Sequence, residues 1–262
     1  MFNPCIFCRE DAAQSQSCEH IIPESLGNFE HILPPGVVCD KCNNYFARKI
    51  EGPLLDTQYF RHARATMQVA NKRKRVPPQL GFLPQLRLPV DVWLDGNSIA
   101  VDPHDKPRRG DFERLLLSKK SVSLWLPLPT QLDQRLMSRF LGKVAIEALA
   151  QRLSGTRGWR EEMLDQGAIE PLRRYVRVGD QQDTWKFTRR RLFPAEQNFG
   201  TDGKCYQILH EFDFLYTEER GLVFVLGLFG EEFSINMGGS DNDPYEAYLQ
   251  ANQGKSLLAP WL

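Results

Sequence analysis

Four of the six cysteines in this chain form two Cys-x-x-Cys pairs, Cys5/Cys8 and Cys39/Cys42. Such a pair can make a tight turn that presents both thiolates to one tetrahedral zinc ion, and two pairs complete a closed structural site. Buried thiols in a fortuitous pattern are the plainer interpretation, and the paired spacing favours zinc. The segment between the pairs is longer than a zinc ribbon needs, so we expect further chemistry inside it.

The inserted segment contains the run E-H-I-I-P-E-S-L-G-N, which begins at Glu19 and His20, and Asn43 follows the last paired cysteine directly. Framed by two cysteine pairs and ending in C-x-x-C-N-N, this stretch resembles the HNH endonuclease family, in particular its zinc-stapled branch. The resemblance covers about residues 5–51 and none of the remaining chain.

HNH nucleases use one divalent ion on a ββα-metal platform, and the resemblance implies a role for each matching residue. His20 matches the general base that takes a proton from the attacking water, and histidine suits this role because it ordinarily titrates near neutrality. Glu19 and Asn43 match the two ligands of the catalytic ion, and their oxygen atoms favour Mg²⁺ or Mn²⁺. The ion would stabilise charge on the phosphate and the leaving 3′ oxygen. The plainer alternatives are a core or zinc-bound histidine, a surface carboxylate and a helix cap.

Two features depart from the family pattern. Pro34 stands where the family has a middle asparagine that orients the base, so a backbone carbonyl, Asn28 or His31 would have to orient it. Neighbouring residues of a regular strand also point to opposite faces. Glu19 and His20 therefore converge on one phosphate only if the strand bends or ends between them.

Local sequence patterns predict the elements that would position these side chains. Residues 21–22 precede a proline and predict a short strand, with residues 37–38 as its expected hairpin partner. From Cys39 the pattern becomes helical and stops near a Gly-Pro pair. Cys39, Cys42 and Asn43 would share one face of that helix at i, i+3 and i+4. A ββα unit with zinc at its base is the expected outcome.

A domain boundary is expected where two prolines follow a second helix, predicted over residues 54–71, and a basic cluster. We therefore expect a zinc-stapled nuclease domain with its linking helix over residues 1–76. Residues 77–262 would form an α+β domain that recognises a substrate, a partner or a signal. The basic cluster consists of Lys72, Arg73, Lys74 and Arg75.

Beyond that boundary, apolar periodicity and turn signals predict a mixture of strands and helices. Strands at 86–94 and 99–101 flank an Asp-Gly turn and should form a hairpin. Residues 130–153 are the clearest helix, because apolar residues recur there at helical spacing. The other expected elements are strands at 122–128, 184–193, 205–217 and 222–235 and helices at 159–177 and 244–250. The fold class is thus α+β, a ββα-metal module followed by a mixed antiparallel-sheet and helix domain.

The charge of the chain is balanced overall but unevenly distributed. Residues 1–60 hold four Lys/Arg against eight Asp/Glu, a balance of −4, whereas residues 61–120 hold thirteen against six, a balance of +7. An acidic nuclease head attracts phosphate poorly, so the basic cluster at 72–75 is the best candidate for contacts with the nucleic-acid backbone. A solvated face is the plainer interpretation.

Composition and the resemblance together suggest a setting. Paired cysteines suit a reducing compartment, the first residues lack a signal-peptide pattern, and the apolar run 222–229 is too short to cross a bilayer, so we expect a cytoplasmic protein without a membrane partner. The resemblance implies hydrolysis of DNA phosphodiester bonds, by nicking or double-strand cleavage, in bacterial or phage defence. The alternatives are a non-catalytic zinc module that binds nucleic acid or a protein, and an RNA-directed nuclease or toxin.

Overall fold

The computed structural model describes residues 2–71, 73–95, 98–118, 121–127, 131–179, 184–194, 210–217 and 221–259. Its contacts divide the chain into two compact units. The first comprises Met1–Glu24, Asn28–Leu54 and Asp133–Leu262, and the second comprises Ser25–Gly27 and Leu55–Leu132. The N-terminal part of the first unit, up to residue 54, is called the cysteine module below. Whether residues 1–76 form a domain of their own stays a prediction.

The two strands of the cysteine module form a minimal hairpin. Strand β1 (Glu19–His20) pairs antiparallel with β2 (Ile32–Leu33). The predicted hairpin between residues 21–22 and 37–38 is therefore wrong. Residues 37–38, the expected second strand, contact the first cysteine pair instead: the carbonyl of Val37 accepts the N–H of Ile6 at 3.1 Å. A short 3-10 helix, η1 (Glu24–Leu26), follows β1 in the chain.

The helix of the cysteine module extends further than its sequence predicts. Helix α1 (Asp40–Phe46) continues through a π-helical turn, η2 (Ala47–Glu51), into α2 (Gly52–Leu55). A proline lacks the N–H that the helical ladder needs, and the wide turn before Pro53 accommodates that interruption. Cys39 is the N-cap rather than a helical residue, and its Sγ accepts the N–H of Cys42 at 3.4 Å.

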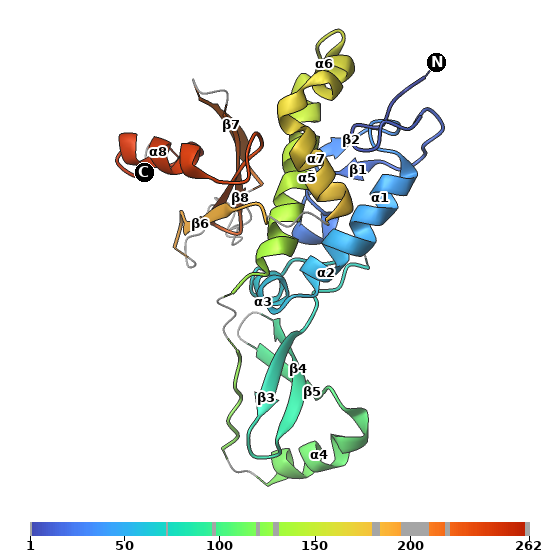
Figure 1. Ribbon diagram of the computed structural model, residues 1–262. Helices are drawn as coiled ribbons and strands as arrows, with labels where there is room; N and C mark the ends of the chain where they lie inside the picture. Colours follow the sequence, from blue (N-terminus) through green and yellow to red (C-terminus); the bar gives the residue numbers. More distant parts are fainter. Residues whose placement is uncertain are drawn as a thin grey trace. The chain divides into compact units, whose positions relative to one another are not determined.

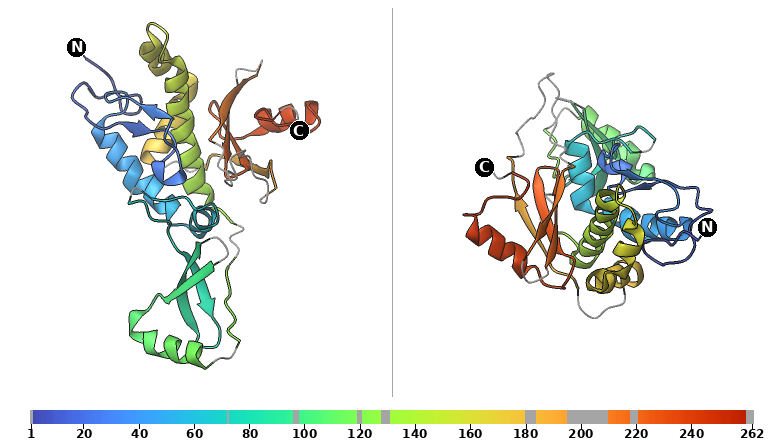
Figure 2. Two further views of the ribbon diagram at one scale, coloured as in Figure 1. Left: turned by 180° about the vertical axis from the view of Figure 1, so that it is seen from behind. Right: turned by 90° about the horizontal axis from the view of Figure 1, so that it is seen from above.

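Helix α5 (Gln134–Leu153) is the central helix of the first unit. Asp133 caps α5 by accepting the N–H of Leu136 at 2.7 Å, so the helix starts at residue 134. Residue 130, the predicted start, lies outside the described residues. The helix is buried along most of residues 137–150. It contacts the cysteine module through η2 on one side and the C-terminal sheet on the other, as the views from different directions show (Figures 1 and 2). The helix predicted over 130–153 is thus confirmed.

The predicted helix at 159–177 is divided into three pieces. These are α6 (Trp159–Asp165), the 3-10 helix η4 (Gly167–Ile169) and α7 (Glu170–Val178). A new helix begins near Pro171 because proline is favoured in the first turn. Helix α7 packs along α5, where Gly142 permits close approach: a Cβ at this position would lie 2.7 Å from Cγ2 of Val176.

The C-terminal sheet is antiparallel, with strand order β6-β9-β8-β7. Its strands are β6 (Phe187–Arg191), β7 (Phe212–Tyr216), β8 (Leu222–Leu228) and β9 (Glu231–Asn236). The single strand expected over 222–235 is two strands, because Phe229 and Gly230 have φ of 53° and 72° and form a two-residue hairpin turn. The part of the predicted strand 205–217 before residue 210 lies outside the described residues.

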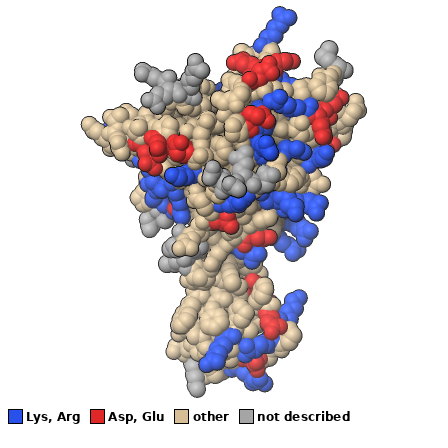
Figure 3. Space-filling view, viewed as in Figure 1, with Lys and Arg blue, Asp and Glu red and all other residues tan. Residues whose placement is uncertain are grey.

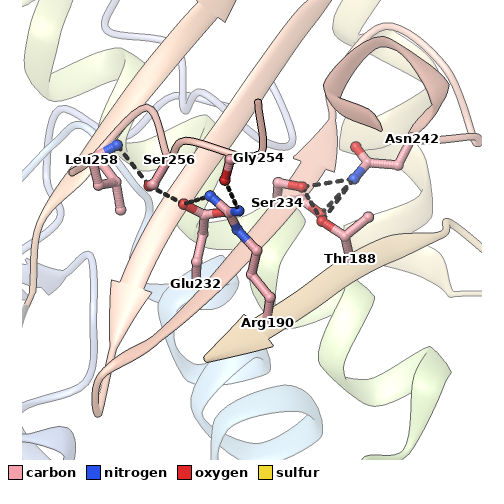
Figure 4. Close-up of polar contacts among 8 residues, drawn as sticks. All are labelled: Thr188, Arg190, Glu232, Ser234, Asn242, Gly254, Ser256 and Leu258. Atoms are coloured by element: carbon pink, nitrogen blue, oxygen red, sulfur yellow. Dashed lines mark hydrogen bonds and ion pairs between the residues drawn. The ribbon is translucent and has the colours of Figure 1, made fainter. Parts of the chain in front are cut away.

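Helix α8 (Asp243–Ala251), predicted over 244–250, is joined to this sheet by a buried polar network (Figure 4). Glu232, which is 1% exposed, pairs with Arg190 at 2.5 Å and also accepts a hydrogen bond from Ser256. Asn242 donates to the hydroxyl of Ser234 at 2.7 Å. The Glu232–Arg190 pair links two strands of the sheet, whereas the contacts of Ser256 and Asn242 join the sheet to the segment after α8 and to the N-cap of α8.

The second unit is a three-stranded antiparallel sheet flanked by helices. Its elements are α3 (Gln58–Thr66), β3 (Gln79–Leu83), β4 (Leu88–Asp95), β5 (Ser98–Pro103), η3 (Lys106–Arg108) and α4 (Arg109–Leu117). The predicted hairpin is confirmed as the β4–β5 pair. Of the strand expected at 122–128, residue 128 lies outside the described residues, and the described part forms a bridge between Trp125 and Phe82. Within the described residues, no helix is long and apolar enough to cross a membrane.

Candidate metal centre and active site

The four paired cysteines lie together in space, as their spacing predicts. Their Sγ atoms are all within 4.8 Å of one another, and those of Cys8 and Cys39 are 3.5 Å apart. Four sulfur atoms bound to one zinc at ~2.3 Å would be separated by roughly 3.8 Å, so the cluster fits a tetrahedral ion. Cys18 is exposed and takes no part in it.

Backbone and side-chain donors surround these sulfur atoms. Sγ of Cys5 accepts the N–H of Cys39 at 3.3 Å and that of Phe7 at 3.5 Å. Nε of Arg177, on α7, donates to Sγ of Cys42 at 3.3 Å. N–H donors of this kind stabilise thiolates that share a metal ion. Sequence reasoning missed Arg177, because only folding brings α7 beside the cysteine module.

Without a metal, the clustered thiols differ in acidity. A hydrogen bond with Cys42 lowers the pKa of Cys5 to about 5, whereas burial raises the pKa of Cys8 to about 11. The same hydrogen bond with Cys5 raises the pKa of Cys42 above its ordinary value. At neutral pH the metal-free cluster therefore holds a thiolate at Cys5 and protons at Cys8 and Cys42. A metal ion would have to displace those protons.

Asn43 links the start of the helix to the strand that carries Glu19 and His20. Its Nδ2 donates to the carbonyl of Cys18 at 3.2 Å, directly before that strand. Both Glu19 and His20 belong to β1, so their side chains leave opposite faces of the strand. Glu19 is 4% exposed, whereas His20 is half-buried. Of the three predicted site residues, Glu19 is thus the one directed into the protein interior.

The carboxylate of Glu19 lies against a lysine that the sequence analysis did not identify. Oε1 of Glu19 is 2.7 Å from Nζ of Lys143, a residue of α5 with no exposed side-chain surface. The same Nζ lies 2.7 Å from Oε1 of Glu51 and 2.9 Å from Oε2 of Glu147. It also donates to the backbone carbonyl of His20 at 3.0 Å. One buried ammonium therefore joins β1, η2 and α5.

The buried location perturbs the acidity of two members of this cluster. Burial opposes the charge of Lys143, but the carboxylates of Glu147, Glu19 and Glu51 outweigh it and raise the lysine pKa well above its ordinary value. Burial likewise raises the pKa of Glu147 well above its usual range. Near neutral pH Lys143 is therefore an ammonium.

Neither side chain considered as a substitute for the middle asparagine has a contact that suits that role. The amide of Asn28 donates to the carbonyls of Ile22 at 2.7 Å and His31 at 3.0 Å, and its oxygen accepts two backbone N–H groups. These bonds close the loop between β1 and β2. Nδ1 of His31 lies 3.3 Å from Oε1 of Gln151, and its ring contacts Phe212. Both side chains thus organise the surroundings of the hairpin.

The basic cluster after α3 belongs to the second unit, where its described members are exposed. The N–H groups of Arg73 and Arg75 donate to Oδ1 of Asn71, and Lys74 adopts a positive φ of 56°. Lys72 lies outside the described residues. Residues 73–75 thus form a solvent-facing turn, and nucleic-acid binding by the cluster stays a prediction.

Comparison with known proteins gives one result, at the N-terminus. A family model for HNH endonucleases matches residues 5–58. The match spans the four clustered cysteines, Glu19, His20 and Asn43, so this segment has the sequence of an HNH endonuclease domain. No curated protein and no solved structure is significantly similar to the chain. Lys143 and Arg177 lie outside the matched segment.

Proposed function

We propose that this protein is a metal-dependent HNH endonuclease that hydrolyses DNA phosphodiester bonds, by nicking or by cutting both strands. The observation that carries the proposal is the hydrogen bond from Asn43 to the carbonyl of Cys18 at 3.2 Å, within the segment that matches the family. It fastens one proposed ligand to the strand that bears the other ligand, Glu19, and the proposed base, His20. Two residues of the cysteine cluster, Cys39 and Cys42, are the N-cap and a first-turn residue of the helix that carries Asn43.

Each residue has a defined part in the proposed reaction. His20, half-buried at the end of β1, accepts a proton from the attacking water. Glu19 and Asn43 offer a carboxylate and an amide oxygen, the hard donors that Mg²⁺ and Mn²⁺ prefer. When bound there, such an ion supplies Lewis-acid stabilisation of the leaving 3′ oxygen. The four cysteines hold a structural zinc ion that keeps the platform rigid.

The surface around α1 and η2 suits a polyanionic substrate better than the negative charge balance of residues 1–60 suggests. Glu19 and Glu51 contribute to the negative balance of the first 60 residues, yet both pair with the buried Lys143. Arg48 and Lys49 are exposed on η2. Figure 3 shows basic side chains gathered over α1 and η2. We propose that this surface attracts the phosphate backbone, and the basic cluster at 72–75 is a separate candidate for such contacts in the second unit.

A non-catalytic zinc module is the second candidate. The pairing of Glu19 with Lys143 favours it, because the ammonium already neutralises the proposed metal ligand. In that case the same fold would bind nucleic acid or a protein without cutting.

Incubation of the zinc-loaded full chain with supercoiled plasmid and Mg²⁺ or Mn²⁺ separates these candidates. We expect conversion to open-circular or linear DNA, and a loss of rate of about 100-fold or more in His20→Ala because a general base contributes that much. His104→Ala is the matched control, since His104 pairs with Asp91 in the second unit. Equal results for wild type and His20→Ala would support the binding module. An RNA substrate in the same assay tests the RNA-directed alternative.

The biological setting is also a proposal. From the resemblance to the zinc-stapled HNH branch we infer that the protein acts as an effector in bacterial or phage defence, and from the paired cysteines that it acts in the cytoplasm. The C-terminal part would then recognise a substrate, a partner or a signal. Phage plating on cells that express the wild type or His20→Ala tests this setting. Equal plating efficiencies would contradict it.

A further inference from the structure

Lys143 reaches the proposed active site from a helix that the family match does not include. It stands 123 positions from His20 in the chain, and its side chain has no exposed surface. A lysine is rarely buried in this way unless its charge is fully compensated, because removal of an ammonium from water is costly. Here three carboxylates and two backbone carbonyls surround it.

The contacts of Lys143 fix both the side chain and the backbone of β1. Its Nζ holds Oε1 of Glu19 at 2.7 Å and donates to the carbonyls of His20 at 3.0 Å and Ile21 at 3.4 Å. These groups belong to three consecutive residues, the two residues of β1 and the one directly after it. A shift of the ammonium would therefore move both residues together.

The lysine is itself held in place from two elements. Glu147 lies one helical turn further along α5 and is fully buried, and Glu51 approaches from η2. These partners restrict the position of Nζ, because an ammonium between fixed carboxylates has few alternative geometries. A side chain that only filled the core would need none of these acceptors.

We propose that Lys143 is a positioning residue of the nuclease site, which sets the orientation of the Glu19 carboxylate and of the backbone at His20. The inference rests on the proposed function. Because Lys143 is fully buried, it does not touch the substrate and acts only through these two residues. The HNH platform of this protein then depends on α5, and the matched segment alone is an incomplete site.

Mn²⁺ binding to the zinc-loaded full chain, measured by electron paramagnetic resonance, tests the proposal. In Lys143→Met we expect Mn²⁺ affinity to fall by about tenfold or more, since loss of a group that orients a metal ligand typically has that effect. With DNA present, kcat should fall while KM changes little. Arg139→Met is the matched control, because Arg139 is a cation on the same helix that bonds Val176 and Tyr45 rather than Glu19. Its Mn²⁺ affinity should stay within about twofold of wild type.

A second variant distinguishes a loss of positioning from a loss of folding. Lys143→Met/Glu147→Met replaces both charges of α5 by apolar side chains, which a buried site often tolerates. It should retain zinc and also lose Mn²⁺ affinity. Unchanged or tighter Mn²⁺ binding in these two variants would overturn the positioning role. Loss of zinc from both variants would also overturn it, because Lys143 would then be needed for folding. A wild type that neither binds Mn²⁺ nor cuts DNA would instead overturn the proposed function.

Discussion

Removal of the Arg173 guanidinium should detach α7 from the first cysteine pair. Arg173 is 1% exposed, and it donates to the carbonyls of Ile6 at 2.8 Å and Met163 at 3.0 Å. Hydrogen bonds from a charged group contribute about 1.5–3 kcal/mol each, so the two bonds together contribute about 3–6 kcal/mol. The additional pair with Glu170 contributes little, because Glu170 is half exposed. We expect Arg173→Met to lower the free energy of unfolding by about 4 kcal/mol.

Zinc release in urea, followed with a colorimetric chelator, reports on the unit that holds the cysteine cluster. With a urea dependence of about 2–3 kcal/mol/M, the midpoint for Arg173→Met should fall by about 1.5 M. Arg174→Met is the matched control, because the neighbouring arginine is exposed. Its change should stay within about 0.5 kcal/mol. Equal midpoints for the two variants would refute the claim that Arg173 stabilises the cysteine module.

Three further predictions concern the cysteine cluster and the helix contact. Cys39→Ser should lose its zinc in metal analysis, whereas Cys18→Ser, at an exposed position, should keep it; equal zinc contents would contradict the assignment. Zinc added to the metal-free protein at pH 7 should release roughly two or more protons, because the thiols of Cys8 and Cys42 have a raised pKa. Calorimetry in buffers of different ionisation enthalpy measures the number of protons released. Gly142→Ala should destabilise by about 1–2 kcal/mol, because the new Cβ would meet Val176 at 2.7 Å. Gly155→Ala has open space and should change stability little, so similar urea midpoints would argue against close packing of α5 and α7.

The parts of the site that could be predicted from sequence are those set by local spacing. Two residues between paired cysteines place both sulfur atoms in one turn, so the cluster follows from the sequence alone. The position of Asn43 next to Cys42 likewise places it at the start of α1. Helix α5 was predictable because its apolar residues recur over several turns.

The parts that could not be predicted depend on contacts between distant segments. The partner of β1 depends on the loop that Asn28 closes, and local apolar residues at 37–38 gave the wrong strand. Lys143 and Glu147 did leave a signal, a charged pair at i and i+4 within residues 140–150, whose other residues are apolar or glycine. That pattern indicates a buried ion pair, but it does not reveal that Glu19 is its partner.

We propose above all that a zinc-held platform presents a second, separate cation site at Glu19 and Asn43. Anomalous diffraction from crystals soaked in Mn²⁺ tests it most directly, because zinc and manganese have different absorption edges. We expect a zinc peak among the four cysteines and a distinct manganese peak beside the Glu19 carboxylate and the Asn43 amide. A zinc peak bound by His20, or no manganese at Glu19 and Asn43, would contradict it.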